Sequence, residues 1–209
     1  MRVLPALLVL GAVPAVSQAT VFNWAFDRIW GDGPNPDGSP PWARIVIRDW
    51  APGVVRLELA NHTQIGSGNF ITRLWLNIGG NSSSVHRVTG PDETPQYIAG
   101  MTYDQNGFNG PASLCGFELT ANFWTDHQNR LTAPNVAIWY LQGVNLDALD
   151  FNYFAATRNG QTTEVAALIH IQGIGFNNMD STWVYAIPGP SALLPFLAGL
   201  IGMRRRRRR

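Results

Sequence analysis

The 209-residue sequence predicts an all-β protein with a single antiparallel β-sandwich domain, jelly-roll-like in its arrangement. Three observations support this fold class. Apolar and polar residues alternate with a period of two in ten short runs. Clusters of Gly, Pro, Asn and Asp, which suit turns, separate these runs. Only the segment 145–153 has a helical pattern, and it is long enough for no more than a turn or two.

The first half of the domain contains the clearest strand patterns. The run 21–26 opens the series, and a loop rich in Gly, Pro, Asn and Asp follows at 31–41. In the run 54–60, alternation places one set of side chains on each face of a strand. The apolar set is Val55, Leu57 and Leu59, and the charged set is Arg56 and Glu58.

The second half contains shorter runs and the one helical candidate. In the segment 145–153, Asn145 is expected to cap the first turn and Asp147 to lie within it. We therefore expect a short helix within an otherwise all-strand domain. In chain order, the ten predicted strands are 21–26, 43–50, 54–60, 70–78, 84–88, 96–103, 116–123, 136–141, 165–172 and 182–186.

Residues 1–19 have the composition of a secretory signal peptide. Arg2 precedes an apolar run at 3–16, and Ser17-Gln18-Ala19 forms a small–x–small cleavage site. A buried N-terminal helix is the alternative, but it would contain two prolines, which break helices. We expect cleavage after Ala19, so that the mature chain begins at Thr20.

The C-terminal segment 187–209 combines three features in order. The triplet Pro188, Gly189 and Pro190 precedes an apolar stretch at 192–203. As a helix, this stretch would be ~18 Å long, which is short of the ~30 Å hydrocarbon core of a membrane. The chain then ends in six arginines, which predict a stop-transfer signal that keeps the C-terminus in the cytoplasm. They are Arg204, Arg205, Arg206, Arg207, Arg208 and Arg209.

Three simpler interpretations of this segment explain only part of it. A plain membrane anchor accounts for the apolar stretch and the arginines but not for the proline triplet. A GPI signal normally ends in its hydrophobic tail rather than in a block of charge. A basic nucleic-acid-binding arm would not need an apolar stretch directly before it.

The full combination resembles the PEP-CTERM sorting signal of exported bacterial proteins. That signal has a Pro-Glu-Pro core, a transmembrane segment and a basic end, and the membrane protease exosortase processes it. Gly189 stands where the family usually has glutamate. The resemblance covers 187–209, and the stretch 166–175 also resembles the part of such proteins that precedes the signal. It implies an exported protein, held briefly in the inner membrane and then placed at the cell surface or outside the cell.

The domain between the two end segments, 20–186, is acidic. Residues 20–187 contain all 14 acidic residues of the chain, no lysine and eight arginines, for a formal charge of −6. This charge argues against nucleic acid as a partner of the domain. The eight arginines are Arg28, Arg44, Arg48, Arg56, Arg73, Arg87, Arg130 and Arg158.

No catalytic, cofactor-binding or metal-binding residues are expected. The histidines lack the spacing of a zinc site, and the alternation predicts that His170 faces away from Ile169 and Ile171. The loop 32–38 carries oxygen atoms suited to calcium, but its spacing is not that of an EF-hand loop. The four histidines are His62, His86, His127 and His170.

A sugar-active hydrolase is one functional alternative. Such an enzyme needs two carboxyl groups about 5–10 Å apart. The acids that we consider for this role, without preference among them, are Asp27, Asp49, Asp104 and Glu118.

The eight tryptophans suggest a second alternative, a carbohydrate-binding module with exposed aromatic rings. Trp30 and Trp42 flank the proline-rich loop and are the first candidates for exposure. The function that we expect is nevertheless non-enzymatic: a structural or adhesive role for an exported surface or matrix protein. Its expected partners are a membrane, an exosortase-type sorting protease and polysaccharide.

Overall fold

The computed structural model describes residues 20–79, 82–109, 114–157 and 163–187. It is all-β, and each of the ten predicted runs lies wholly or mostly in a strand. Two short strands, β8 and β10, were not predicted. In chain order the strands are β1 (Val21–Ile29), β2 (Ala43–Ala51), β3 (Val54–Asn61), β4 (Phe70–Leu76), β5 (Ser83–Val88), β6 (Ile98–Asn109), β7 (Leu114–Phe123), β8 (Leu131–Thr132), β9 (Val136–Val144), β10 (Ala156–Thr157), β11 (Ala167–Ile174) and β12 (Asp180–Ala186).

Three short 3₁₀ turns are the helical elements of the described chain: η1 (Pro95–Tyr97), η2 (Ala148–Phe151) and η3 (Phe176–Asn178). The turn predicted near 145–153 is therefore present as η2, but its cap is different. The Asp147 side chain accepts hydrogen bonds from the backbone of Leu149 and Asp150, so Asp147 caps the turn. Asn145 instead has a φ of 57°, a left-handed conformation in which Asn is common.

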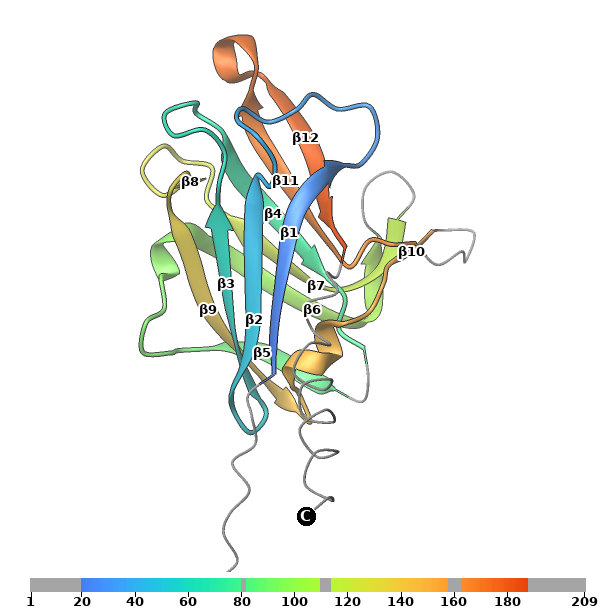
Figure 1. Ribbon diagram of the computed structural model, residues 1–209. Coiled ribbons are helices and arrows are strands. Elements are labelled where there is room, and N and C mark those ends of the chain that lie inside the picture. Colours follow the sequence, from blue (N-terminus) through green and yellow to red (C-terminus); the bar gives the residue numbers. More distant parts are fainter. Residues whose placement is uncertain (1–19, 80–81, 110–113, 158–162, 188–209) are drawn as a thin grey trace, which may run out of the picture.

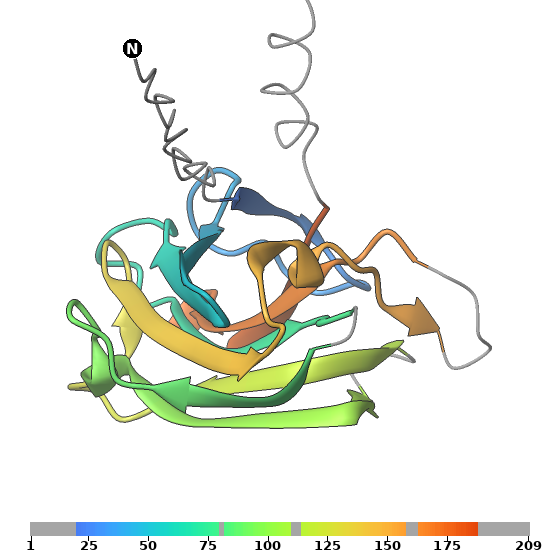
Figure 2. The same cartoon turned by 90° about the horizontal axis from the view of Figure 1, so that it is seen from below.

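All strand pairs are antiparallel and belong to one continuous sheet (Figure 1). Its order is β10-β7-β4-β11-β12-β1-β2-β3-β9-β5, with β6 paired to β7 and β8 paired to β4. The sheet curls so far that β5 and β6 also touch, and it is therefore nearly closed (Figure 2).

The expected sandwich of two separate sheets is not shown. β1 pairs with β12 on one side and with β2 on the other. A bulge between Phe26 and Arg28 lets the strand bend as it carries the hydrogen bonds around the molecule. Alternation in a sequence reveals which face of a strand is apolar, but it does not reveal which strands become neighbours.

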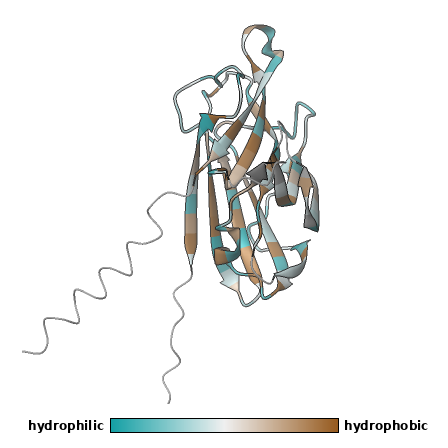
Figure 3. Ribbon diagram, turned by 90° about the vertical axis from the view of Figure 1, so that its right-hand side faces the viewer, coloured by the Kyte–Doolittle hydropathy of each residue, from teal (hydrophilic) through white to brown (hydrophobic). Residues whose placement is uncertain are grey.

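The interior of the curled sheet is filled by the apolar face of each strand. Along the strands, brown and teal residues alternate in Figure 3. Val55, Leu57 and Leu59 are fully buried, as the alternation in β3 predicted. Burial of one such side chain contributes about 1.5–3 kcal/mol, so this inner face supplies most of the stability of the fold.

The strands define two ends of the molecule, which Figure 1 shows at the top and the bottom. The upper end carries η3 and the loops after β1, β3 and β7, and the lower end carries the β2–β3 turn and η2. β1 begins at the lower end, and β12 runs toward it because the two strands are antiparallel.

Residues 1–19 and 188–209, which include most of the predicted leader and sorting segments, lie outside the described residues. Within the described part of the chain, no helix has the length and apolar character needed to cross a membrane.

A buried arginine fastens a loop to the outer side of the sheet. The Arg56 side chain is only 4% exposed. Its Nη2 donates to Asp92 Oδ2 at 2.6 Å, and its Nη1 donates to Glu58 Oε2 at 2.7 Å. The Tyr140 hydroxyl also donates to Asp92, which lies in the loop between β5 and η1. Hydrogen bonds from Arg56 and then Tyr140 lower the pKa of Asp92 to about 2.

We predict that Asp92→Asn lowers the melting temperature at pH 7 and makes the melting temperature less sensitive to a fall in pH. The pKa of Asp92 is about 2 in the folded protein and 3.8 ordinarily. Asp92 therefore contributes stability above about pH 4, and this contribution is lost as the pH falls toward 2. Thermal unfolding followed by circular dichroism between pH 7 and pH 2.5 measures both effects. Asp27→Asn, at an exposed carboxylate on β1, is the control. An unchanged melting temperature at pH 7 for Asp92→Asn would contradict the prediction.

Candidate functional site

Four outward-facing side chains form a row across neighbouring strands β12, β11, β4 and β7. His170 pairs with Trp183 on one side and with Arg73 on the other, and Arg73 pairs with Asn122. Each of them has at least one direct neighbour along its strand in the main core, as Ile169 and Ile171 are for His170. Because neighbouring strands are ~4.8 Å apart, this transverse row is ~14 Å long.

Aromatic stacking and a hydrogen bond hold the centre of the transverse row. The rings of His170 and Trp183 stack with centroids 4.1 Å apart. His170 Nδ1 lies 2.8 Å from Thr72 Oγ1. The Trp183 ring also meets Trp75 edge-on, at 4.8 Å between centroids. His170 points away from Ile169 and Ile171, which confirms the expectation from the sequence.

His170 is uncharged at neutral pH. Burial and, as the smaller effect, the positive charge of Arg73 lower its pKa to about 4. A neutral imidazole has one ring nitrogen that donates and one that accepts a hydrogen bond. The ring therefore contributes a polar group without charge to the middle of the row.

Arg73 places an accessible positive charge next to His170. Its Nε donates to Asn122 Oδ1 at 2.7 Å, which fixes the orientation of the guanidinium group. The guanidinium carbon lies 5.1 Å from the centroid of the Trp75 ring, a cation–π arrangement. The residue is exposed, so the outer edge of the guanidinium faces solvent.

An aromatic pair, Trp30 and Tyr185, lies beside the transverse row. Their rings meet edge-on at 5.8 Å between centroids, and both side chains are partly exposed. The Tyr185 hydroxyl donates to Glu164 Oε1 at 3.0 Å, and Arg28 Nη1 donates to the same oxygen at 3.3 Å.

The two tryptophans singled out in the sequence have different environments. Trp30 is partly buried and packs against the smaller apolar cluster. Trp42 is only 5% exposed and packs in the main core, so it is not the exposed ring that the sequence left possible. Its Nε1 donates to the Gly38 carbonyl at 3.3 Å, which ties the proline-rich loop to the core.

A hollow of about 330 Å³ continues the row toward the upper end. Gln172 and Ser181, two residues from His170 and Trp183 along their strands, lie in its wall with Arg130 and Asp180. Arg130 stacks over the Phe70 ring at 4.2 Å, and its Nε donates to the Thr125 carbonyl at 2.8 Å. The hollow therefore adds a second guanidinium group to the same face.

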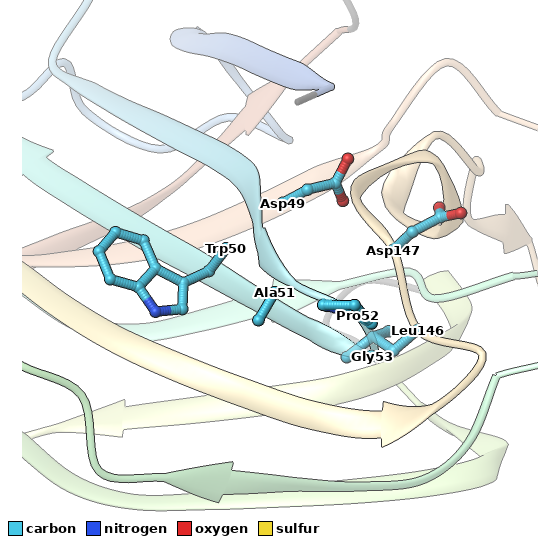
Figure 4. A pocket seen from close by; sticks show the side chains of 7 residues that line it. All are labelled: Asp49, Trp50, Ala51, Pro52, Gly53, Leu146 and Asp147. Carbon is cyan, nitrogen blue, oxygen red and sulfur yellow. The ribbon is translucent and has the colours of Figure 1, made fainter. Parts of the chain in front are cut away.

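A separate pocket of about 400 Å³ lies at the lower end, between the β2–β3 turn and the start of η2 (Figure 4). The carboxylates of Asp49 and Asp147 lie on one side of it, and the Trp50 ring points away from them. Asp49 Oδ1 accepts a hydrogen bond from the backbone of Ala148 at 2.8 Å, and Oδ2 accepts one from Thr20 at 2.9 Å. Because Asp147 caps η2, both carboxylates hold the backbone in place.

The four candidate acids of a hydrolase lie on two pairs of neighbouring strands, β1 and β2, and β6 and β7, and neither hollow described above contains two of them. Glu118 Oε2 accepts a hydrogen bond from the backbone of Ile78 at 2.8 Å, and burial raises the pKa of Glu118. Asp49 is similarly bound to backbone amides. These two carboxylates have structural partners in the fold.

The loop 32–38, considered above for calcium, is held by hydrogen bonds to Asn69. Asp37 Oδ2 accepts one from Asn69 Nδ2 at 3.0 Å, and the Asp37 backbone donates to Asn69 Oδ1 at 2.7 Å. Among the residues that the structure describes, no group of three or more His, Cys, Asp and Glu side chains is placed to hold a metal ion.

The predicted sorting residues 188–190 and 204–209 lie outside the described residues, as does Ala19 on one side of the expected cleavage site. No family model, curated protein or solved structure matches the chain.

Sequence reasoning did not single out Arg73 and Asn122. The signal for Arg73 was available, because it is the one charged residue within the apolar run of β4.

We predict that one histidine of the folded protein titrates near pH 4, and that this is His170. Since the ordinary pKa is 6.5, the buried neutral ring makes folding less favourable as the pH falls from 6.5 toward 4. NMR titration of the imidazole signals measures the pKa, and His170→Asn assigns the signal. Trp183→Ala uncovers the ring and moves the pKa toward 6.5. A His170 signal that titrates near 6.5 in the unmodified protein would refute the prediction.

Proposed function

We propose that this protein is exported, is sorted through its C-terminal segment, and has a non-enzymatic structural or adhesive role at the cell surface or in the extracellular matrix. The observation that carries the proposal is the order of signals in the sequence. A leader precedes the acidic domain, and a proline triplet, an apolar stretch and six arginines follow it. The resemblance to PEP-CTERM signals supports an exosortase-type protease as the processing partner.

The limits of the folded domain support this arrangement. β1 starts at Val21, directly after the expected cleavage site, and β12 ends at Ala186, directly before the triplet. All strands of the described sheet therefore lie between the predicted leader and the predicted sorting segment.

The sorting mechanism that we propose depends on the cost of moving charge into a membrane. The leader exports the domain, and the apolar stretch 192–203 enters the bilayer. The six arginines stop further transfer because guanidinium groups are costly to remove from water. The triplet then presents an extended segment to the protease, since proline disfavours a helix.

We expect the protein isolated from its native host to begin at Thr20 and to lack the arginines at 204–209. Intact mass spectrometry measures both ends in one experiment. A chain that retains the arginines would indicate a plain anchor, and a chain that retains residues 1–19 would overturn the proposed export. Replacement of residues 204–209 by serine is expected to abolish retention of the chain in the membrane before cleavage.

Leader cleavage also creates a charge next to Asp49. Thr20 N lies 2.9 Å from Asp49 Oδ2, and the Asp49 backbone donates to the Thr20 carbonyl at 3.2 Å. After cleavage, the nitrogen becomes an ammonium group that faces this carboxylate. The new ion pair would fasten the start of β1 to β2.

We predict that Asp49→Asn destabilises a chain that begins at Thr20 by ~1–2 kcal/mol, because the carboxylate also bonds the first turn of η2. Urea denaturation measures the loss. Acetylation of the Thr20 amino group is expected to destabilise the parent chain but to have little effect on Asp49→Asn. Equal effects of acetylation on both chains would show that the amino group does not pair with Asp49.

Carbohydrate binding is a second candidate function, and the transverse row favours it. Trp183 lies in the row, and Trp30 and Tyr185 lie beside it on the same outer face. Partly exposed aromatic rings next to hydrogen-bonding groups are suited to sugars, which have apolar faces and polar edges. A sugar-active hydrolase is the weaker alternative.

A further inference from the structure

We propose that the transverse row and the hollow beside it bind an acidic polysaccharide, with the carboxylate of a uronate-type sugar on Arg73. This inference rests on the second candidate function, carbohydrate binding, and assigns it a site and a ligand class. The site consists of Trp183, His170, Arg73 and Asn122, and it extends to Arg130 in the hollow.

The shape of the row suits a chain molecule. Its four side chains come from four adjacent strands, so they lie side by side at intervals of ~4.8 Å. The ~14 Å length leaves room for more than one sugar ring, and the hollow of about 330 Å³ adjoins the row. A polysaccharide lying across the strands can therefore contact the aromatic, neutral and charged members in turn.

The chemistry of the row changes along its length. Trp183 and the neighbouring Tyr185 supply aromatic surface for the C–H face of a sugar. The neutral His170 ring and the Asn122 amide supply donors and acceptors for hydroxyl groups. His170 is held by Thr72 and by stacking on Trp183, so its position is fixed before a ligand arrives.

The partners of the arginines point to an anionic ligand. Among the described residues, Arg28, Arg56 and Arg87 form ion pairs with carboxylates. Arg73 bonds instead to the Asn122 amide, and Arg130 bonds to a backbone carbonyl. The neutral acceptor of Arg73 orients its guanidinium group without cancelling its charge, whereas Arg130 shares the hollow with the Asp180 carboxylate.

A carboxylate complements this arrangement. The planar guanidinium group can donate two parallel hydrogen bonds to a carboxylate, which gives specificity as well as attraction. The domain as a whole has a formal charge of −6, so long-range attraction does not favour polyanions in general. Binding must therefore come from local contacts, and it needs sugar rings for the aromatic members as well as charge for Arg73.

We predict that the full chain in mild detergent binds polygalacturonate and alginate, and binds dextran and hydroxyethyl cellulose at least tenfold more weakly. Immobilised protein and biolayer interferometry measure this. Arg73→Gln is expected to weaken binding of the acidic polymers at least tenfold. Arg44→Gln, at an exposed arginine on β2, is the matched control and leaves binding unchanged. Trp183→Phe tests the aromatic member with little loss of packing, and circular dichroism verifies that each variant is folded.

The possible results distinguish carbohydrate binding in general from binding of an acidic ligand at Arg73. Equal binding of neutral and acidic polysaccharides, unaffected by Arg73→Gln, would retain carbohydrate binding and overturn the acidic ligand. Equal binding of poly-L-glutamate would show that charge alone is recognised and would overturn the site. No binding to any polysaccharide would overturn both carbohydrate binding and the site. The masses of the processed chain test export separately.

Discussion

One continuous ladder of hydrogen bonds around a single core is the constraint on which this structure depends. β1 joins β12 to β2 through a bulge, so the sheet can curl around its apolar side chains. Every strand then has one face committed to the interior. The opposite face carries a second, smaller apolar cluster around Trp75 and Leu168, and beside it polar and charged side chains. The transverse row and the Arg56–Asp92 bonds both lie on this outer side of the sheet.

The outer face is divided into regions with different electrostatic roles. Over β3 and β9, the positive charge of Arg56 is neutralised by Glu58 and Asp92, and the result is a fastened loop. Over β4 and β11, Arg73 has only neutral hydrogen-bonding partners among its described contacts and is exposed. The same residue type therefore stabilises the fold in one region and is available to a ligand in the other. Burial and partner choice make this difference.

The sequence predicted the strands well and their neighbours poorly. In β3, the alternation of Leu57 and Leu59 with charged residues identified the buried face because that pattern is local. The pairing of His170 with both Trp183 and Arg73 depends on strand order and register, which no local pattern contains. For this reason the transverse row could not be predicted from the sequence, although the sequence contains each of its four residues. The burial of Trp42 was left open by the sequence, because it depends on how the preceding loop folds back, with the Gly38 carbonyl accepting a hydrogen bond from Trp42 Nε1.

The position of β12 has a mechanical consequence. This strand lies between β1 and β11 and is antiparallel to both, and the chain continues from its end toward the predicted membrane segment. A load between a ligand on Arg73 of β4 and the residues after Ala186 would pass through β11 to β12. Hydrogen bonds in antiparallel sheets lie perpendicular to the strands, so a load parallel to the strands would shear the bonds of a ladder together instead of unzipping them one by one. The sheet beside the C-terminal end of the domain would therefore resist tension along its strands.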